Sequence, residues 1–181
     1  MNYHKIEKTS IANGTGIRVV LWVSGCSLHC KGCHNPETWS LCSGKLFDEG
    51  AKKELFEALD KPYIQGITFS GGHPFEPQNV EEVLNLCKEI KEKFPTKDIW
   101  LYTGYTFEDI CEQYCNQAIW NLYKNVTEHN IWSNIKYIDV IVDGKFVEEE
   151  KDITLLFRGS RNQRLIDIQK TLKALEIVLY N

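Results

Sequence analysis

Three cysteines lie close together in the first fifth of the chain, where residues 25–35 read GCSLHCKGCHN. Cys26, Cys30 and Cys33 are separated by three and then two residues. Thiolates are ligands of zinc and of iron–sulfur clusters, so this spacing predicts a metal centre. A disulfide framework is not expected, because the seven cysteines are an odd number and the sequence shows no export signal.

Three thiolates leave the choice of metal open. A structural zinc site has four protein ligands, so zinc would need a fourth ligand such as His29, His34 or Cys42. A four-iron cluster needs one ligand on each iron, and three thiolates would leave one iron open to an exogenous ligand. An open iron can do chemistry, whereas a closed zinc site is structural.

Strands that alternate with amphipathic helices must position this loop. Apolar, β-branched runs predict strands at 17–23, 64–70, 98–103 and 137–142. Helical patterns predict helices at 48–60, at about 79–94 and from 106 onward. Asp48 and Thr106 are expected to cap the first and third helices, and Pro62 to end the first. This alternation predicts a mostly parallel sheet built from right-handed βαβ units.

The cysteine loop directly follows the first predicted strand. Loops at the carboxyl ends of parallel strands commonly hold functional groups, so its position suits a cofactor. Residues 116–134 predict a helix with an irregular end or an inserted loop, and EIVLY at 176–180 is compatible with a last strand. The predicted strands are too few for a closed eight-stranded barrel.

Composition indicates a single globular domain that acts on small molecules or on another protein. The chain has 181 residues, of which 43% are hydrophobic, and this is enough for one sizeable core. A net charge of −4 without a Lys/Arg block gives little support for binding nucleic acid or a membrane surface. No apolar run is long enough to span a bilayer, and we expect a cytoplasmic protein.

The cysteine signature and several other segments resemble a known family. CSLHCKGC resembles the C-x3-C-x2-C signature of radical S-adenosylmethionine enzymes, and NGTGIR at 13–18 is similar to a segment of glycyl-radical-enzyme activases. Within that group, the anaerobic ribonucleotide reductase activating proteins have similar sequences at five more places. These are NPETW at 35–39, GITFSGGHPFEPQN at 66–79, KDIWLYTGYTFEDI at 97–110, VDGKF at 142–146 and RGSRNQR at 158–164. The resemblance covers about residues 1–165 apart from 112–134.

This resemblance implies a mechanism and a fold. In the family the three cysteines bind a [4Fe–4S] cluster, and S-adenosylmethionine chelates the open iron through its amino and carboxylate groups. An electron from the reduced cluster cleaves the sulfonium and gives methionine and a 5′-deoxyadenosyl radical. The implied fold is a shortened, open (β/α) partial barrel of about five or six strands, a single radical S-adenosylmethionine domain over residues 1–181, with the cluster in the loop after the first strand.

The implied function is activation of the class III anaerobic ribonucleoside-triphosphate reductase. The deoxyadenosyl radical would abstract a hydrogen atom from a glycine of the reductase large subunit. An electron donor such as flavodoxin would reduce the cluster. No catalytic residue beyond the cluster is expected, because the sequence shows no Ser/His/Asp constellation or paired carboxylates.

The resemblance also assigns contacts to S-adenosylmethionine. Gly32, Cys33 and His34 would lie against the adenine, and the pair Gly71 and Gly72 against the methionine part. The family usually has an acidic residue after this pair, and here the residue is His73. We expect either that His73 is neutral and accepts a hydrogen bond from the ligand, or that main-chain groups and Glu76 replace it.

Other notable residues are predicted to be structural. Cys87 and Cys111 lie on apolar helix faces, and Trp22, Trp39 and Trp100 are expected to pack around the sheet and the cysteine loop. Cys111 and Cys115 are four apart, but no further ligand is near them in the sequence. For Arg18 and the segment 158–164, a solvated surface, a structural lock and a partner-docking surface all stay open.

Two rival functions remain. One is activation of another glycyl-radical enzyme, such as pyruvate formate-lyase. The other is a zinc-stabilised binding module without enzymatic activity. Metal content separates the second rival, because it would hold zinc in place of iron and sulfide.

Overall fold

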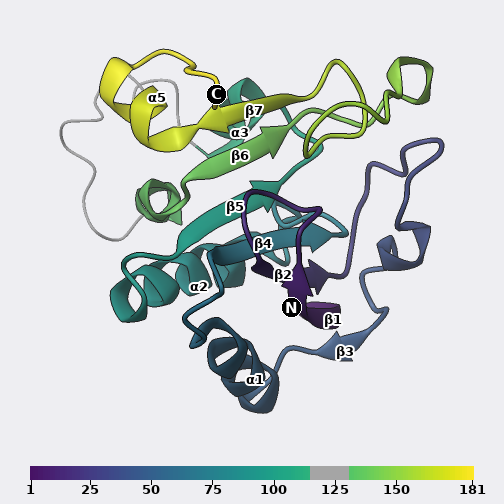
Figure 1. Ribbon diagram of the computed structural model, residues 1–181. Coiled ribbons are helices and arrows are strands. Elements are labelled where there is room, and N and C mark those ends of the chain that lie inside the picture. The colour runs from purple at the N-terminus through teal and green to yellow at the C-terminus, as the bar shows by residue number, and fades with distance from the viewer. Residues whose placement is uncertain (115–130) are drawn as a thin grey trace.

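The computed structural model describes residues 1–114 and 131–181, which form an α/β fold around one open sheet (Figure 1). Seven strands are present in these residues, in the spatial order β3 (Lys45–Leu46), β1 (Asn2–Ser10), β2 (Arg18–Val23), β4 (Gly66–Gly71), β5 (Asp98–Tyr102), β6 (Val140–Asp143) and β7 (Arg164–Asp167). Strands β2, β4, β5 and β6 are parallel to one another. The other three pair antiparallel with their neighbours, so the sheet is mixed and has β3 and β7 as its edges.

The helices pack against one face of the sheet. They are α1 (Glu49–Leu59), α2 (Val80–Lys93), α3 (Phe107–Tyr114), α5 (Ile168–Ala174) and the 3₁₀ helix η3 (Ile131–Tyr137). Alternate strand residues such as Leu21, Phe69 and Leu101 are fully buried in the core that these helices cover. Because side chains alternate along a strand, Trp22 and Tyr102 lie on the opposite face. That face therefore has room for a site that the helices do not cover.

The strands predicted at 17–23, 64–70, 98–103 and 137–142 and the three predicted helices are confirmed within the described residues. The Asp48 carboxylate accepts a hydrogen bond from the Ala51 N–H at 2.8 Å and caps α1. At the start of α3 the Thr106 hydroxyl accepts from the Asp109 N–H at 3.1 Å, and the Asp109 carboxylate accepts from the Thr106 N–H at 2.9 Å. This reciprocal pair satisfies main-chain groups that a helix end leaves free. None of the helices in the described part of the chain is long and apolar enough to cross a membrane.

Three features of the predicted sheet are wrong. It has seven strands, not about five or six, it is mixed rather than mostly parallel, and the cysteine loop follows its second strand. The first strand, β1, was missed because NYHKIEKTS has charged residues and no clear alternation; pairing with β2 and β3 on its two sides stabilises it. The last strand is β7, and residue Leu179 of EIVLY forms only an isolated bridge with Ile166. Most of the segment predicted at 116–134 lies outside the described residues.

Arg18 forms a buried ion pair at the amino ends of the parallel strands. Its guanidinium is fully buried, donates to Asp98 Oδ1 at 2.6 Å and to Thr68 Oγ1 at 2.8 Å, and lies 5.2 Å from the centre of the Trp100 ring. These contacts tie β2 to β4 and β5. Of the alternatives for Arg18, the structural lock is the one observed.

We predict that Arg18→Met lowers the free energy of unfolding by about 3 kcal/mol, because it leaves the Asp98 carboxylate and several buried acceptors without their donor. Lys8→Met is the matched control, since Lys8 pairs with Glu54 on the surface and its loss costs at most about 1 kcal/mol. Anaerobic denaturant unfolding of both variants measures the difference. Equal and small losses would contradict the assignment of Arg18 as a lock.

Candidate iron–sulfur site

A cavity of about 270 Å³ opens at the carboxyl ends of the parallel strands, at the edge of the face that the helices leave uncovered. Its walls come from the cysteine loop, from the segments after β4 and β5, and from the segment after β6. The residues that define these walls include Cys26, Cys30, Cys33, His34 and Trp39; Gly71, Gly72 and His73; Tyr102 and Thr103; Gly144, Phe146 and Gln163. In Figure 1 the cysteine loop and the segment after β6 extend beyond the same end of the sheet.

The cysteine loop is held in shape by main-chain hydrogen bonds. The Gly25 N–H donates to the Thr38 carbonyl at 2.7 Å, and the Cys26 N–H donates to the Trp39 carbonyl at 2.9 Å. All three predicted metal ligands, Cys26, Cys30 and Cys33, line the cavity. Burial raises the pKa of the Cys26 thiol, and main-chain N–H groups of the loop oppose this effect. A metal would therefore bind Cys26 with release of its proton.

The donor set fits a cluster of several irons. In the described residues, no three His, Cys, Asp or Glu side chains converge closely enough to hold a single metal ion. A four-iron cluster places each thiolate on a different iron, so its ligands surround a volume and need not converge on one point. Of the three candidate fourth ligands for zinc, His34 lines the cavity, whereas His29 and Cys42 do not. Among these three candidates, His34 is therefore the one placed beside the three thiols.

Gly72 allows the loop after β4 to lie directly on the cysteine loop. A Cβ at this position would lie 2.5 Å from the Gly25 carbonyl oxygen, a distance that forces the two loops apart. The Gly72 N–H donates to the Val23 carbonyl at 2.8 Å, and the His73 N–H donates to the Gly25 carbonyl at 2.7 Å. The ends of β2 and β4 are thereby joined.

Gly32 is placed differently from the other predicted contacts. It is exposed, has φ +72° and does not line the cavity. A Cβ here would lie 2.9 Å from the Glu148 carboxylate, and its neighbour Lys31 pairs with Glu148 at 2.9 Å. Close contact of Gly32 with a nucleotide therefore stays a prediction.

His73 is 1% exposed, and both of its ring nitrogens already have partners. Nδ1 lies 3.3 Å from Glu76 Oε2 and Nε2 lies 2.8 Å from the Thr103 hydroxyl. A carboxylate only accepts, so we assign the proton to Nδ1, and the Thr103 hydroxyl then donates to Nε2. Burial lowers the pKa of His73, and the nearby Glu76 carboxylate only partly opposes this shift. The ring is therefore neutral at pH 7, but both nitrogens are engaged by Glu76 and Thr103, so neither is free to accept a hydrogen bond from a ligand.

Glu76 connects His73 to the cysteine loop. Its Oε2 atom accepts hydrogen bonds from the Ser27 N–H at 3.1 Å and from the Ser27 hydroxyl at 3.3 Å. Ser27 directly follows Cys26. The chain of contacts from Thr103 through His73 and Glu76 to Ser27 joins the ends of β2, β4 and β5 around the cavity.

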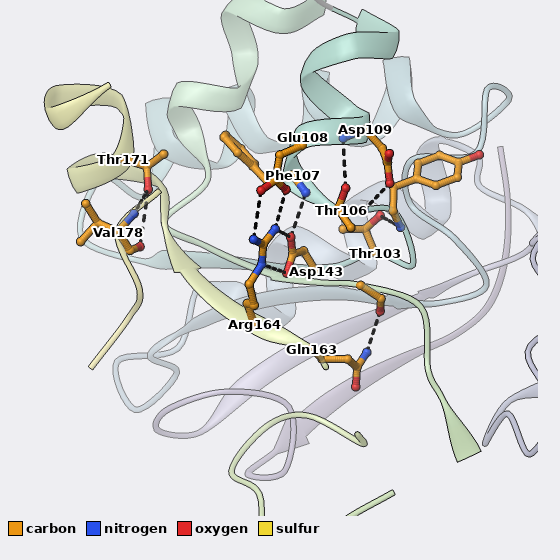
Figure 2. A network of polar contacts seen from close by, with 12 residues as sticks. Thr103, Thr106, Phe107, Glu108, Asp109, Asp143, Gln163, Arg164, Thr171 and Val178 are labelled. Atoms are coloured by element: carbon orange, nitrogen blue, oxygen red, sulfur yellow. Dashed lines mark hydrogen bonds and ion pairs between the residues drawn. The ribbon is translucent and has the colours of Figure 1, made fainter. Parts of the chain in front are cut away.

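Arg164 holds the wall that the segment after β6 forms (Figure 2). Its guanidinium donates to Asp143 at 2.5 Å and to Glu108 at 2.6 Å, and the Asp143 carboxylate also accepts from the Phe107 N–H at 2.8 Å. These two carboxylates raise the pKa of Arg164. The amino end of α3 is thus tied to the end of β6 and the start of β7.

Gln163 holds the loop beside the cavity. Its amide nitrogen donates to the Gly144 carbonyl at 2.9 Å, and its amide oxygen accepts from the Gly159 N–H at 2.8 Å. Arg158 donates to the Gln163 carbonyl at 2.9 Å, and Arg161 pairs with Asp152 at 3.1 Å. The arginines of the segment 158–164 therefore make internal bonds, as in the structural-lock alternative.

Several lining residues were not predicted as site residues. Phe146 faces His34, with 6.3 Å between the ring centres, and Thr103 and Gln163 line the cavity as well. These residue types carry no metal or acid–base signal by themselves. Their positions indicate a site for Thr103 and Phe146, because Thr103 ends one predicted parallel strand and Phe146 closely follows another.

The cavity lining combines apolar and aromatic side chains with a few polar groups and carries no full charges. No Asp, Glu, Lys or Arg is among the described residues that line it. The carboxylates of Glu76 and Asp143 are buried behind the wall. A zwitterionic ligand would therefore meet main-chain groups, amides, hydroxyls and thiols.

Comparison with known proteins identifies the family. A protein-family model described as a 4Fe-4S single cluster domain matches residues 12–166. The chain is 46% identical over 165 residues to the anaerobic ribonucleoside-triphosphate reductase-activating protein of Enterobacteria phage T4, in a match that covers 91% of this chain and 93% of that protein. The proteins of the same name from Haemophilus influenzae and Escherichia coli K12 are each 39% identical, over 90% of this chain and 96% of the relative. The chain therefore belongs to the family of anaerobic ribonucleoside-triphosphate reductase-activating proteins and contains a 4Fe-4S cluster domain.

Proposed function

We propose that this protein activates an anaerobic ribonucleoside-triphosphate reductase as a radical S-adenosylmethionine oxidoreductase. Cys26, Cys30 and Cys33 would hold a [4Fe–4S] cluster, and S-adenosylmethionine would occupy the iron that has no thiolate. The observation that carries the proposal is the placement of three thiols around one uncharged cavity at the carboxyl ends of the parallel strands. The names of the relatives supply the target, the reductase.

The bound cluster would supply the electron that cleaves S-adenosylmethionine, and the resulting 5′-deoxyadenosyl radical would generate a glycyl radical on the reductase large subunit. An electron donor such as flavodoxin would reduce the cluster, in the cytoplasm. We infer that the open sheet is the partial (β/α) barrel of the radical S-adenosylmethionine type and that residues 1–181 form one such domain. An open sheet leaves a side from which a loop of a large protein can reach the cavity.

The chain's own residues would bind and orient S-adenosylmethionine. Phe146 and His34 lie next to each other on the lining, and their rings would pack against the adenine, beside Cys33 and Gly32. The main chain at Gly71 and Gly72 would bind the amino acid part. His73 has both nitrogens engaged, so we assign it a positioning role: it orients Glu76 and Thr103 and leaves ligand binding to main-chain groups.

A glycyl-radical assay tests the function. Anaerobically reconstituted protein, mixed with the reductase, S-adenosylmethionine and a reductant, should give the electron paramagnetic resonance doublet of a glycyl radical on the reductase. The same mixture with pyruvate formate-lyase in place of the reductase is the specificity control. A radical on pyruvate formate-lyase alone would show that this enzyme is the target instead. A protein that binds zinc and no iron would support the zinc-stabilised binding module.

Serine substitutions test the ligand set. Cys26→Ser, Cys30→Ser and Cys33→Ser should each lose most of the about four irons and four sulfides that the wild type binds, because a hydroxyl is a poor ligand for this cluster. Cys42→Ser is the matched control, since Cys42 is an exposed thiol close in sequence that does not line the cavity. Iron and sulfide analysis gives the readout. Loss of the cluster in Cys42→Ser would show that the ligand set is wrong.

The buried His73 predicts a pH dependence of stability. Its pKa in the folded protein lies below its value of about 6.5 in the unfolded chain, so the unfolded chain binds more protons as the pH falls below that value. Stability should therefore be constant above about pH 6.5 and decrease below it. His73→Gln should reduce this slope, whereas His34→Gln, which replaces an exposed imidazole, should leave it unchanged. Chemical unfolding of cluster-free protein between pH 5 and pH 8 measures both slopes, and equal slopes in wild type and His73→Gln would refute the assignment.

A further inference from the structure

The indole N–H of Trp39 is a buried donor without an acceptor. Its Nε1 atom is inaccessible to solvent and has no hydrogen-bond partner among the described residues. Trp39 lines the same cavity as the three cysteines. Buried N–H groups in folded proteins nearly always have an acceptor, so this one indicates that a bound group supplies it.

The ring of Trp39 is held in place by two neighbours in the cysteine loop. His29 stacks on it with 4.6 Å between ring centres and 28° between planes, and its own backbone has the unusual φ of +44°. The Trp39 carbonyl accepts the N–H of Cys26. The indole thus packs on the loop between Cys26 and Cys30, and the main chain of Trp39 is bonded to Cys26.

Trp22 provides a natural comparison. It also lines the cavity, but its indole N–H donates to Glu7 Oε2 at 3.0 Å. The indole N–H of Trp22 thus has an acceptor, whereas that of Trp39 has none within the described part of the protein.

We propose that the indole N–H of Trp39 donates a hydrogen bond to a sulfur of the bound cluster, either a sulfide or a cysteine thiolate, and thereby raises the reduction potential of the cluster. The inference rests on the proposed function, because it requires the cluster in this cavity. Reduction adds negative charge to the cluster sulfurs, and a hydrogen-bond donor stabilises that charge. Trp39 is therefore a tuning residue in addition to a packing residue.

Trp39→Phe tests the effect on potential, because it keeps an aromatic ring against His29 and removes the N–H. In a redox titration of reconstituted protein, followed by electron paramagnetic resonance, its reduced-to-oxidised ratio at a fixed potential should be about tenfold lower than in wild type, a change of about 59 mV for one electron. Trp22→Phe is the matched control and should leave the potential unchanged. Equal potentials in Trp39→Phe and wild type would overturn the proposal.

A second measurement detects the hydrogen bond itself. Protein labelled with ¹⁵N at the indole nitrogen should show a ¹⁵N hyperfine coupling to the reduced cluster. This coupling should be absent in Trp39→Phe and present in Trp22→Phe. Its persistence in Trp39→Phe would overturn the proposal even if the potential had shifted.

The outcomes separate this inference from the proposed function. Wild-type protein without an iron–sulfur signal would contradict the proposed function. A normal cluster with no indole coupling would contradict only the role of Trp39. A Trp39→Phe variant with weaker S-adenosylmethionine affinity and an unchanged potential would assign the N–H to that ligand and would also overturn the proposal.

Discussion

The cavity depends on the direct contact between the main chains at the ends of β2 and β4. The Gly72 and His73 N–H groups donate to the Val23 and Gly25 carbonyls, and no side chain separates the two segments. This contact fixes the direction in which the cysteine loop leaves the sheet. The positions of the three thiols relative to the rest of the cavity follow from it.

Charged residues strengthen this arrangement from outside the cavity. Glu76 and Asp143 are buried, and each accepts main-chain N–H groups from a neighbouring loop. Their charges are therefore used to join strand ends and do not face the cavity lining. No Asp or Glu among the described lining residues would therefore repel an anionic cluster.

The sequence was sufficient to predict those strands and helices whose local residue patterns agree with the fold. Buried parallel strands such as β4 read as continuous apolar runs, and the caps Asp48 and Thr106 mark where their helices begin. The three cysteines could be assigned to one site because their spacing is local.

Features that depend on distant partners could not be predicted. Strand β1 has no clear pattern of its own and forms because β2 and β3 pair with it. The role of Gln163 arises from a segment more than a hundred residues after the cysteine loop, which only the tertiary fold brings back to it. The engagement of both His73 nitrogens likewise needs Thr103, on a different strand end.

The ion pair between Lys31 and Glu148 differs from the other ties around the cavity because it is exposed on the surface. Exposed pairs contribute at most about 1 kcal/mol and are screened by salt, whereas the link through Arg164 reaches the buried Asp143. The contact that Lys31 and Glu148 make between the cysteine loop and the segment after β6 is thus the weaker of the two ties. Raising the ionic strength should consequently weaken the contact between the cysteine loop and the segment after β6 more than it weakens the fold.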